Sequence, residues 1–390
     1  MNKIKFHFFY LMVLIFSSVN IFSAYARTDA AIDSRLALLK PIKIAFILAK
    51  TGIAARTVLP FLNMAKLAVE EINKQGGLSG QPVEYIILDN KSTPIGSSMA
   101  AEEAVRLQVT AVIGAIWSSH SLAIAPILQK AKIPMITPSS TNPRVTLAGN
   151  YIFRVCFIDS FQGKIMAIFA RTEFDARTSV VLKILNEEYS LTLAEFFIRH
   201  FEKNGGKVIG EKSYKVKDID FVEILKDVKH LNPEIVYIPG YSRDSGLLIR
   251  QADLMGIHTV FLGGDGWNDQ IYVYGGKTVE GNFYSSQWHP DISSPGSIYL
   301  NKIYMLKYGT KIPVSNAALI YDSVMLLADA AKRAGTSDPG KIRKALAETK
   351  EFEGITGSIT FDENGDPINK AGIIMKLGQN APIFFKTVKP

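Results

Sequence analysis

The sequence predicts an α/β protein in which parallel sheets are covered by helices on both faces. Short apolar runs of strand length alternate with longer segments whose apolar residues recur at helical spacing. This alternation starts again near Phe161, so the same pattern occurs twice along the chain. We therefore expect two Rossmann-like lobes, each with its own sheet and flanking helices.

In the first repeat, a helix over 58–74 is the clearest element. Phe61, Ala65 and Ala68 recur at helical spacing, and Gly76-Gly77 ends the segment. The same patterns predict further helices at 97–107 and 122–130, and strands at 42–49, 83–88, 111–114 and 133–136.

The second repeat predicts helices at 161–174, 191–204, 221–230 and 245–255, separated by strands at 180–185, 207–211, 235–239 and 260–263. Beyond Gly281 the pattern changes to a strand at 283–286, helices at 296–307, 317–333 and 339–348, and strands at 357–361, 372–377 and 383–388. These late elements are too few for a third domain. We expect them to complete the two lobes through crossing hinge strands.

The N-terminus has the features of an export signal. Lys3 and Lys5 precede an apolar run over 6–22, and Ala24-Tyr25-Ala26 forms a small-x-small cleavage site. Residues 1–26 are therefore expected to be removed on export, which predicts a periplasmic location. The alternative is an uncleaved membrane anchor, although the run is short for a bilayer. Residues 27–41 are expected to form a tether or a short helix.

Composition narrows the class of protein. The hydrophobic content of 47% and the charged content of 21% are typical of globular domains. The single cysteine, Cys156, cannot form an internal disulfide, so stability must come from large cores. The net charge of +8 is spread along the chain among acidic residues, so we expect no nucleic-acid partner.

Two strand ends supply polar groups suited to capturing a small ligand. Hydroxyls cluster in the stretches 114–119 and 133–143, each just after an apolar run. Ser118 precedes a helix, so its hydroxyl and the free N–H groups of that helix suit an anion, and Thr141 lies in a similar turn. Asp265, between two glycines, is placed to balance an ammonium group. Alternatively, these serine and threonine residues only cap helices and the aspartate only stabilises its turn.

Several motifs together resemble the type I periplasmic solute-binding proteins of the branched-chain amino acid (Leu/Ile/Val) family, the soluble receptors of ABC importers. They are Ile72-Asn73 with Gly76-Gly77, the stretch 136–143, Pro239-Gly240-Tyr241 and Gly264-Asp265-Gly266. The resemblance implies two discontinuous lobes that meet at a cleft. The boundaries we expect are 42–159 with 289–369 for the first lobe, and 160–288 with 370–390 for the second.

The resemblance also implies residue roles. Ser118, Thr141 and the Tyr241 hydroxyl would bind the carboxylate of an amino acid. Asp265, the Ser139 carbonyl and the Thr141 hydroxyl would bind its ammonium. Tyr189 would line the cleft from the second lobe. Without the resemblance, Tyr241 could equally be a half-buried packing residue.

The chain departs from the family pattern around the ligand side chain. Thr57 and Asn316 stand where aromatic walls are expected, which predicts a more polar and roomier pocket. Trp117 and Trp267 flank the expected ligand groups, where they either stack on a planar ligand or pack under their turns. His120 is expected in the first turn of a helix, with ligand contact as the alternative. Polar, aromatic and amide-bearing amino acids all remain open as ligands.

The predicted function is therefore capture of an amino acid, or a related small compound, by hinge closure. The partner would be an ABC permease, and the protein itself a monomer without cofactor or metal. An exported sensor module is the alternative. Catalysis is not expected, because 77–81 lacks the final glycine of a nucleophile elbow and the histidines lack metal-ligand spacing. The acids Glu187-Glu188 are expected on a solvated loop.

Overall fold

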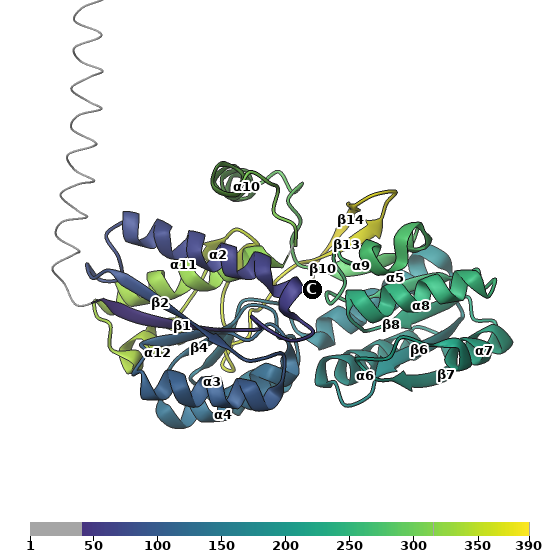
Figure 1. The fold of residues 1–390 in the computed structure, drawn as a ribbon, viewed down its shortest axis with the longest axis horizontal. Helices are drawn as coiled ribbons and strands as arrows, with labels where there is room; N and C mark the ends of the chain where they lie inside the picture. Colours follow the sequence, from purple (N-terminus) through teal and green to yellow (C-terminus); the bar gives the residue numbers. More distant parts are fainter. Residues whose placement is uncertain (1–40, 315, 390) are drawn as a thin grey trace, which may run out of the picture.

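The computed structural model describes residues 41–389 except residue 315, and it contains two sheet-based lobes side by side (Figure 1). The predicted export signal, 1–26, lies outside the described residues, as does the predicted tether apart from its last residue. None of the helices in the described part of the chain combines the length and apolar character needed to cross a bilayer.

The first lobe is built on a parallel five-stranded sheet in the order β2-β1-β3-β4-β5. Its strands are β1 (Ile42–Leu48), β2 (Val83–Asp89), β3 (Ala111–Gly114), β4 (Met135–Thr137) and β5 (Ile152–Arg154). Its helices are α2 (Ala55–Lys74), α3 (Pro94–Arg106), α4 (Ser118–Ala131), α10 (Pro295–Tyr308), α11 (Ala317–Ala334) and α12 (Pro339–Ala347), with a 3-10 turn, η1 (Pro143–Ala148).

Alternate residues of β1 enter different cores, because successive side chains of a strand point to opposite faces of the sheet. Phe46 belongs to the core that α2 and α11 form on one face. Ala45 and Ile47 belong to the core that α3 and α4 form on the other (Figure 1). The late helices α10, α11 and α12 therefore help to complete the first lobe, as the sequence predicted.

The second lobe has a seven-stranded sheet in the order β14-β13-β10-β9-β8-β6-β7. Its strands are β6 (Thr178–Ile184), β7 (Lys207–Tyr214), β8 (Ile235–Ile238), β9 (Val260–Gly263), β10 (Phe283–Ser286), β13 (Gly372–Leu377) and β14 (Pro382–Val388). The antiparallel pairs in this sheet are β10 with β13 and β13 with β14. The helices are α5 (Asp159–Phe174), α6 (Glu188–Lys203), α7 (Val222–Leu231), α8 (Ser242–Leu254) and α9 (Ile271–Gly275), followed by the 3-10 turn η2 (Gly276–Val279).

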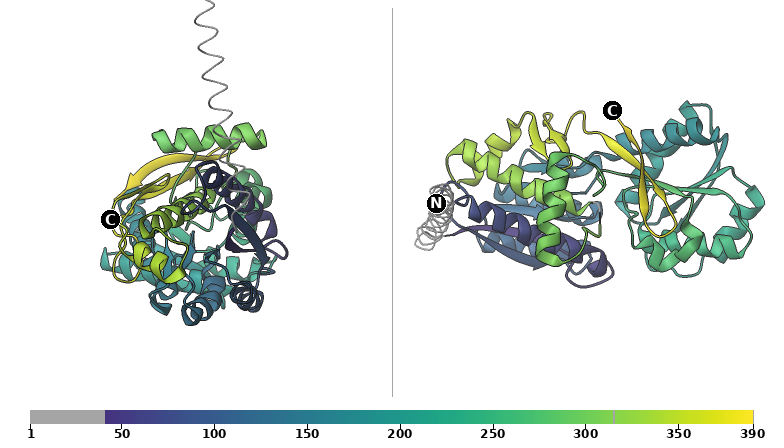
Figure 2. Two further views of the ribbon diagram at one scale, coloured as in Figure 1. Left: turned by 90° about the vertical axis from the view of Figure 1, so that its left-hand side faces the viewer. Right: turned by 90° about the horizontal axis from the view of Figure 1, so that it is seen from above.

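The chain passes three times between the two sheets: after β5, after β10 and before β13 (Figure 2). A short hairpin of β11 (Phe352–Gly354) and β12 (Gly357–Ile359) precedes the last passage. The exact lobe boundaries drawn from the sequence stay a prediction.

The predicted elements are present, but several helices begin earlier than predicted. The helices α3, α4, α6 and α8 each start three or four residues before the range taken from the sequence. Their first turns contain polar residues, so the apolar repeat that indicates a helix only becomes visible in the second turn. The short elements β5, α9 and β11 were not predicted.

The five strands of the first lobe and the first five strands of the second lobe, β6 to β10, have the same spatial order. In the first lobe the order reverses between β1 and β3, and in the second it reverses between β6 and β8. Open parallel sheets bind ligands at the carboxyl ends of their strands beside such a reversal. The topology therefore directs attention to the loops after β1, β3, β6 and β8.

Candidate functional site

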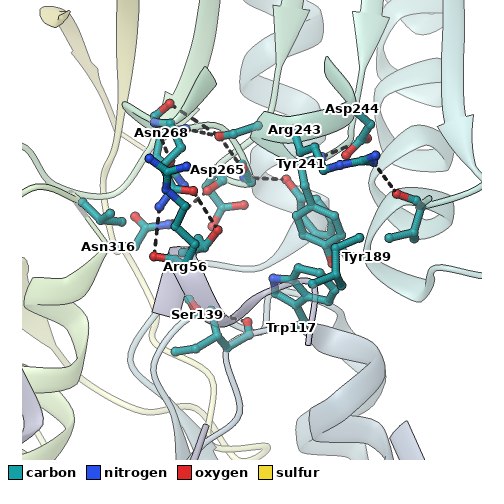
Figure 3. Close-up of a pocket in the computed structure, with 18 of the residues that line it drawn as sticks. Arg56, Trp117, Ser139, Tyr189, Tyr241, Arg243, Asp244, Asp265, Asn268 and Asn316 are labelled. Carbon is teal, nitrogen blue, oxygen red and sulfur yellow. Dashed lines mark hydrogen bonds between the residues drawn. The ribbon is translucent and has the colours of Figure 1, made fainter. Parts of the chain in front are cut away.

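A cavity of about 80 Å³ lies between the lobes at these strand ends (Figure 3). One buried water needs roughly 10–15 Å³, so this space suits a small solute. Of the predicted residues, the first lobe contributes Thr57, Trp117, Ser118, Ser139 and Asn316 to the lining, and the second lobe contributes Tyr189, Tyr241 and Asp265.

Asp265 is held in place by amide groups. Its two carboxylate oxygens accept hydrogen bonds from Gln162 Nε2 at 3.1 Å and Gln287 Nε2 at 3.0 Å. Asn316, at the start of α11, donates to the Asp265 carbonyl at 3.1 Å. Burial raises the pKa of Asp265 to about 6, although the amide hydrogen bonds oppose this shift. Among the described residues no cation pairs with this carboxylate, so it is poised to accept one from a ligand.

The other predicted polar groups join neighbouring turns. Ser118 Oγ accepts a hydrogen bond from the Asn142 N–H at 3.3 Å, and Ser139 Oγ donates to the Ile116 carbonyl at 3.1 Å. The Tyr189 hydroxyl accepts from the Gly266 N–H at 3.0 Å. Ser118 is also the first residue of α4, so the start of that helix faces the cavity with N–H groups that have no partner within the helix.

Four rings form an aromatic column across the cleft, made of Tyr189, Tyr241, Trp117 and His120. Trp117, from the first lobe, stacks on Tyr241, from the second, with ring centroids 4.1 Å apart and an interplanar angle of 12°. Tyr189 stacks on the far side of Tyr241 at 5.6 Å, and His120 stacks on Trp117 at 5.2 Å. Trp117 therefore contacts the opposite lobe directly, an arrangement that the sequence did not predict.

A family model for periplasmic binding proteins matches residues 41–381. The chain belongs to this family. The Leu/Ile/Val-binding resemblance inferred from the motifs is confirmed, and so is the fold class. As a periplasmic binding protein, the chain is a substrate-binding protein rather than an enzyme.

Several relatives of this binding protein carry informative names. The leucine-, isoleucine-, valine-, threonine- and alanine-binding protein of Pseudomonas aeruginosa is 30% identical over 309 residues, covering 77% of this chain and 80% of the relative. The crystal structure of a leucine-binding protein, LivK, from Thermotoga maritima has a TM-score of 0.86 at 37% identity, covering 90% of this chain and 99% of the other.

Two further solved structures bound to ligands are similar. LivJ from Streptococcus pneumoniae, in complex with isoleucine, has a TM-score of 0.84 at 31% identity, covering 90% of this chain and all of the other. A solute-binding protein from R. palustris, in complex with benzoate, has a TM-score of 0.81 at 17% identity, covering 90% and 97%. The second of these shows only a shared fold.

Three predicted residues of this binding protein lie outside the cavity lining. Trp267 is buried, and its indole N–H donates to Ser245 Oγ at 2.8 Å. Its ring packs over Gly263, where a Cβ would approach the ring to 2.3 Å. Of the two alternatives that the sequence left open for Trp267, this arrangement matches packing beneath its turn.

His120 also lies outside the lining. Its Nδ1 is 3.3 Å from Asn90 Nδ2, and burial lowers its pKa to about 4, so the ring is neutral at pH 7. It supports Trp117 from behind, as the fourth ring of the aromatic column.

Thr141 is buried, and its hydroxyl has no hydrogen-bond partner among the described residues. Its carbonyl accepts from the Asp159 N–H at 2.9 Å. Asp159 is itself buried with both carboxylate oxygens unpartnered, and burial raises its pKa well above the ordinary range. In this arrangement of the lobes, Thr141 is not exposed to the cavity, in contrast to the role that the resemblance implied.

Glu187 and Glu188 were expected on a solvated loop. This is wrong for Glu187, which is buried, whereas Glu188 begins α6 and its side chain is 40% exposed. Ser119 Oγ donates to Glu187 Oε2 at 3.3 Å, and Arg144 forms an ion pair with Glu188 at 2.9 Å. Asn142 Nδ2 donates to the Glu188 carbonyl at 3.1 Å. The loop after β6 faces the first lobe, so these acids join the lobes beside the cavity, and burial raises the pKa of Glu187 to about 7.

Sequence reasoning missed several polar lining residues, among them Arg56, Ser242, Arg243, Asp244, Asn268 and Gln270. Gln270 bridges the lobes, because it accepts from Thr57 Oγ1 at 3.1 Å and donates to the Arg56 carbonyl at 3.1 Å. Their closeness in sequence to Thr57, Tyr241 and Asp265 was the available signal. Within the described residues, no group of His, Cys, Asp and Glu could hold a metal ion.

Proposed function

We propose that this chain is the periplasmic receptor of an ABC importer and captures an α-amino acid by closing two hinged lobes around it. The main support is Asp265, a buried carboxylate that faces a cavity between the lobes and has no cation partner within residues 41–389 as the structure describes them. Such a group is costly unless a positive charge joins it, and the ammonium of an amino acid supplies that charge. The names of the relatives also favour an amino acid ligand.

The opposite end of the zwitterion would lie at the start of α4. The Ser118 hydroxyl and the positive end of the helix dipole suit a carboxylate there, although the His120 and Ser121 N–H groups already donate to the Trp117 carbonyl. The carboxylate site belongs to the first lobe and Asp265 to the second. A ligand that binds both would therefore favour the closed arrangement of the lobes, which a permease could then recognise.

The side chain of the ligand would be polar rather than branched aliphatic. The predicted positions Thr57 and Asn316 both line the cavity with polar groups, and Asn268 and Gln270 add two amides. Thr57 and Gln270 already pair with each other, but Asn316 Oδ1 is buried with no hydrogen-bond partner among the described residues. An aliphatic side chain cannot supply that partner. We also propose that the exported protein acts as a monomer, with residues 1–26 removed.

Binding experiments on the purified protein test this proposal. In a thermal-shift screen of the natural amino acids, at least one should raise the melting temperature, because a bound ligand stabilises the folded state by mass action. Calorimetry should then show a single site, with leucine and isoleucine weaker than the best polar amino acid.

The first testable variant is Asp265→Asn. It keeps the size of the side chain but removes the charge that the ammonium needs, so affinity should fall at least about 100-fold. Asp253→Asn, an exposed acid on α8, is the matched control and should bind as the natural chain does. Unchanged affinity in Asp265→Asn, or a best ligand without an amine, would contradict the proposal.

A further inference from the structure

The cavity contains a positive charge that the binding of a simple zwitterion leaves unused. Arg56, in the first turn of α2, lines the cavity (Figure 3). Its backbone carbonyl accepts from Gln270, but among the described residues its guanidinium forms no hydrogen bond or ion pair. Arg56 is exposed at the edge of the cavity, so its guanidinium is free to pair with an anionic group of a ligand that reaches this edge.

The other charged lining residues already have partners or a role. Asp244 accepts hydrogen bonds from the Tyr214 hydroxyl and the Tyr241 N–H, so it is part of the second lobe's own structure. Arg243 donates to the carbonyls of Val216 and Asp218, which fixes it against the loop after β7. Asp265 is assigned to the ammonium, so Arg56 is the charge that remains.

We infer that the ligand carries a second anionic group, a side-chain carboxylate, and that Arg56 binds it. This inference rests on the proposed capture of an α-amino acid and names its class as the amino dicarboxylic acids. Arg56 and Ser118 come from the first lobe and Asp265 from the second. The three charged ends of such a ligand would therefore each meet a complementary group, with both lobes engaged.

The polar neighbours of Arg56 are consistent with this assignment. Thr57 follows it in α2, and Gln270 reaches it from the second lobe. A guanidinium binds a carboxylate through two parallel N–H donors, and the two charges compensate each other. An amide side chain is neutral, so it leaves the positive charge of the guanidinium uncompensated. Specificity would therefore depend on charge more than on size.

Matched ligands of equal shape test the inference directly. Calorimetry should compare L-glutamate with L-glutamine, and L-aspartate with L-asparagine, on the full mature chain. At least one acid should bind about tenfold or more tightly than its amide, because a charge-assisted hydrogen bond is stronger than a neutral one. Added salt should lower the affinity for the acid more than the affinity for the amide.

Variants test whether Arg56 causes the preference for the acid over the amide. Arg56→Gln should remove the advantage of the acid while leaving the affinity for the amide within about threefold, and Arg56→Lys should restore part of it. Arg250→Gln, an exposed arginine on α8, removes the same charge away from the cavity and should keep the preference. Thermal unfolding of each variant establishes that it is folded.

The outcomes separate this inference from the proposed function. If neutral amino acids bind best and binding still depends on Asp265, the inference is wrong and the amino acid receptor stands. An acid preference that survives Arg56→Gln overturns the role of Arg56. If no α-amino acid binds, both this inference and the proposed function are wrong.

Discussion

At the scale of single residues, Trp117 offers a direct optical report of lobe closure. Its ring stacks on Tyr241 of the opposite lobe at 4.1 Å. The other tryptophans, Trp267 and Trp288, are buried and donate their indole N–H groups to Ser245 and Ser297. The environment of Trp117 therefore changes when the lobes move, while those of the other two stay fixed.

Titration with the amino acid found by thermal screening should change the tryptophan fluorescence of the protein. In Trp117→Phe, which keeps an aromatic ring in the column, this change should disappear although calorimetry still detects binding. Trp288→Phe is the control and should retain it. A ligand-dependent signal that persists in Trp117→Phe would show that closure does not alter the column.

Single residues also show what the sequence could predict of the site. Asp265 and Ser118 were predicted because each follows a strand that must end at the cleft. For Trp267, two residues beyond Asp265, the sequence left two alternatives open, because the direction of its ring depends on Gly263 and Ser245, which only the folded turn brings beneath it. Arg56 was missed because an exposed arginine in a helix gives no local signal of a cavity.

At the scale of elements, α11 shows how a segment late in the chain belongs to the first lobe. Its buried residues share one core with β1 and α2, although some 250 residues separate them in sequence. Leu327 is fully buried in that core. Packing of this kind makes the early and late segments one cooperative unit.

Leu327→Ala should therefore destabilise the protein by about 2–5 kcal/mol, because it removes buried methylene groups and leaves a cavity. Leu306→Ala on α10 is the control, since Leu306 is 77% exposed and should change stability by less than about 0.5 kcal/mol. Chemical denaturation of both variants measures the difference. Equal stabilities would mean that α11 adds little to the first core.

The order of elements was predictable because buried strands and amphipathic helices have different apolar periods. Helix starts were not, because polar first turns such as Ser118 to Ser121 lack that period. The strand β5 is only three residues long, too short for a pattern to stand out. Local sequence thus determines whether most elements are helices or strands. The residue at which a helix begins depends on the surroundings of its first turn in the folded protein.

At the scale of the whole molecule, the repeated pattern predicted two lobes, and both sheets do share one strand order. The contacts between lobes could not be predicted, because they join residues with no shared local pattern. Glu187 is the clearest case. Its carboxylate accepts a hydrogen bond from Ser119 of the first lobe, and Glu188 with its ion-pair partner Arg144 lies beside it.

Closure should therefore be coupled to uptake of a proton. Burial raises the pKa of Glu187 from about 4.5 to about 7, the Ser119 and Tyr241 hydroxyls oppose the shift, and Glu188 adds to it. A raised pKa means that the contact is most favourable below the ordinary pKa and weakens as pH rises through 7. Ligand affinity should thus fall between pH 5.5 and 7.5, by up to about tenfold per pH unit. Calorimetry across this range measures the slope.

Glu187→Gln should flatten this slope, because the amide cannot ionise while it keeps the shape of the protonated acid. Asp265, with a pKa raised to about 6, adds a slope of opposite sign below pH 6, because a bound ammonium favours its ionised form. This contribution is the same in the variant and in the natural chain, so the difference between their profiles isolates the part due to Glu187. Glu188→Gln keeps the Glu187 carboxyl but removes a negative charge that raises its pKa, so the slope should persist and shift to lower pH. If Glu187→Gln and the natural chain have the same pH profile, closure does not depend on the protonation of this carboxyl. The hydrogen bond from Ser119 would then not contribute to the pH dependence of binding.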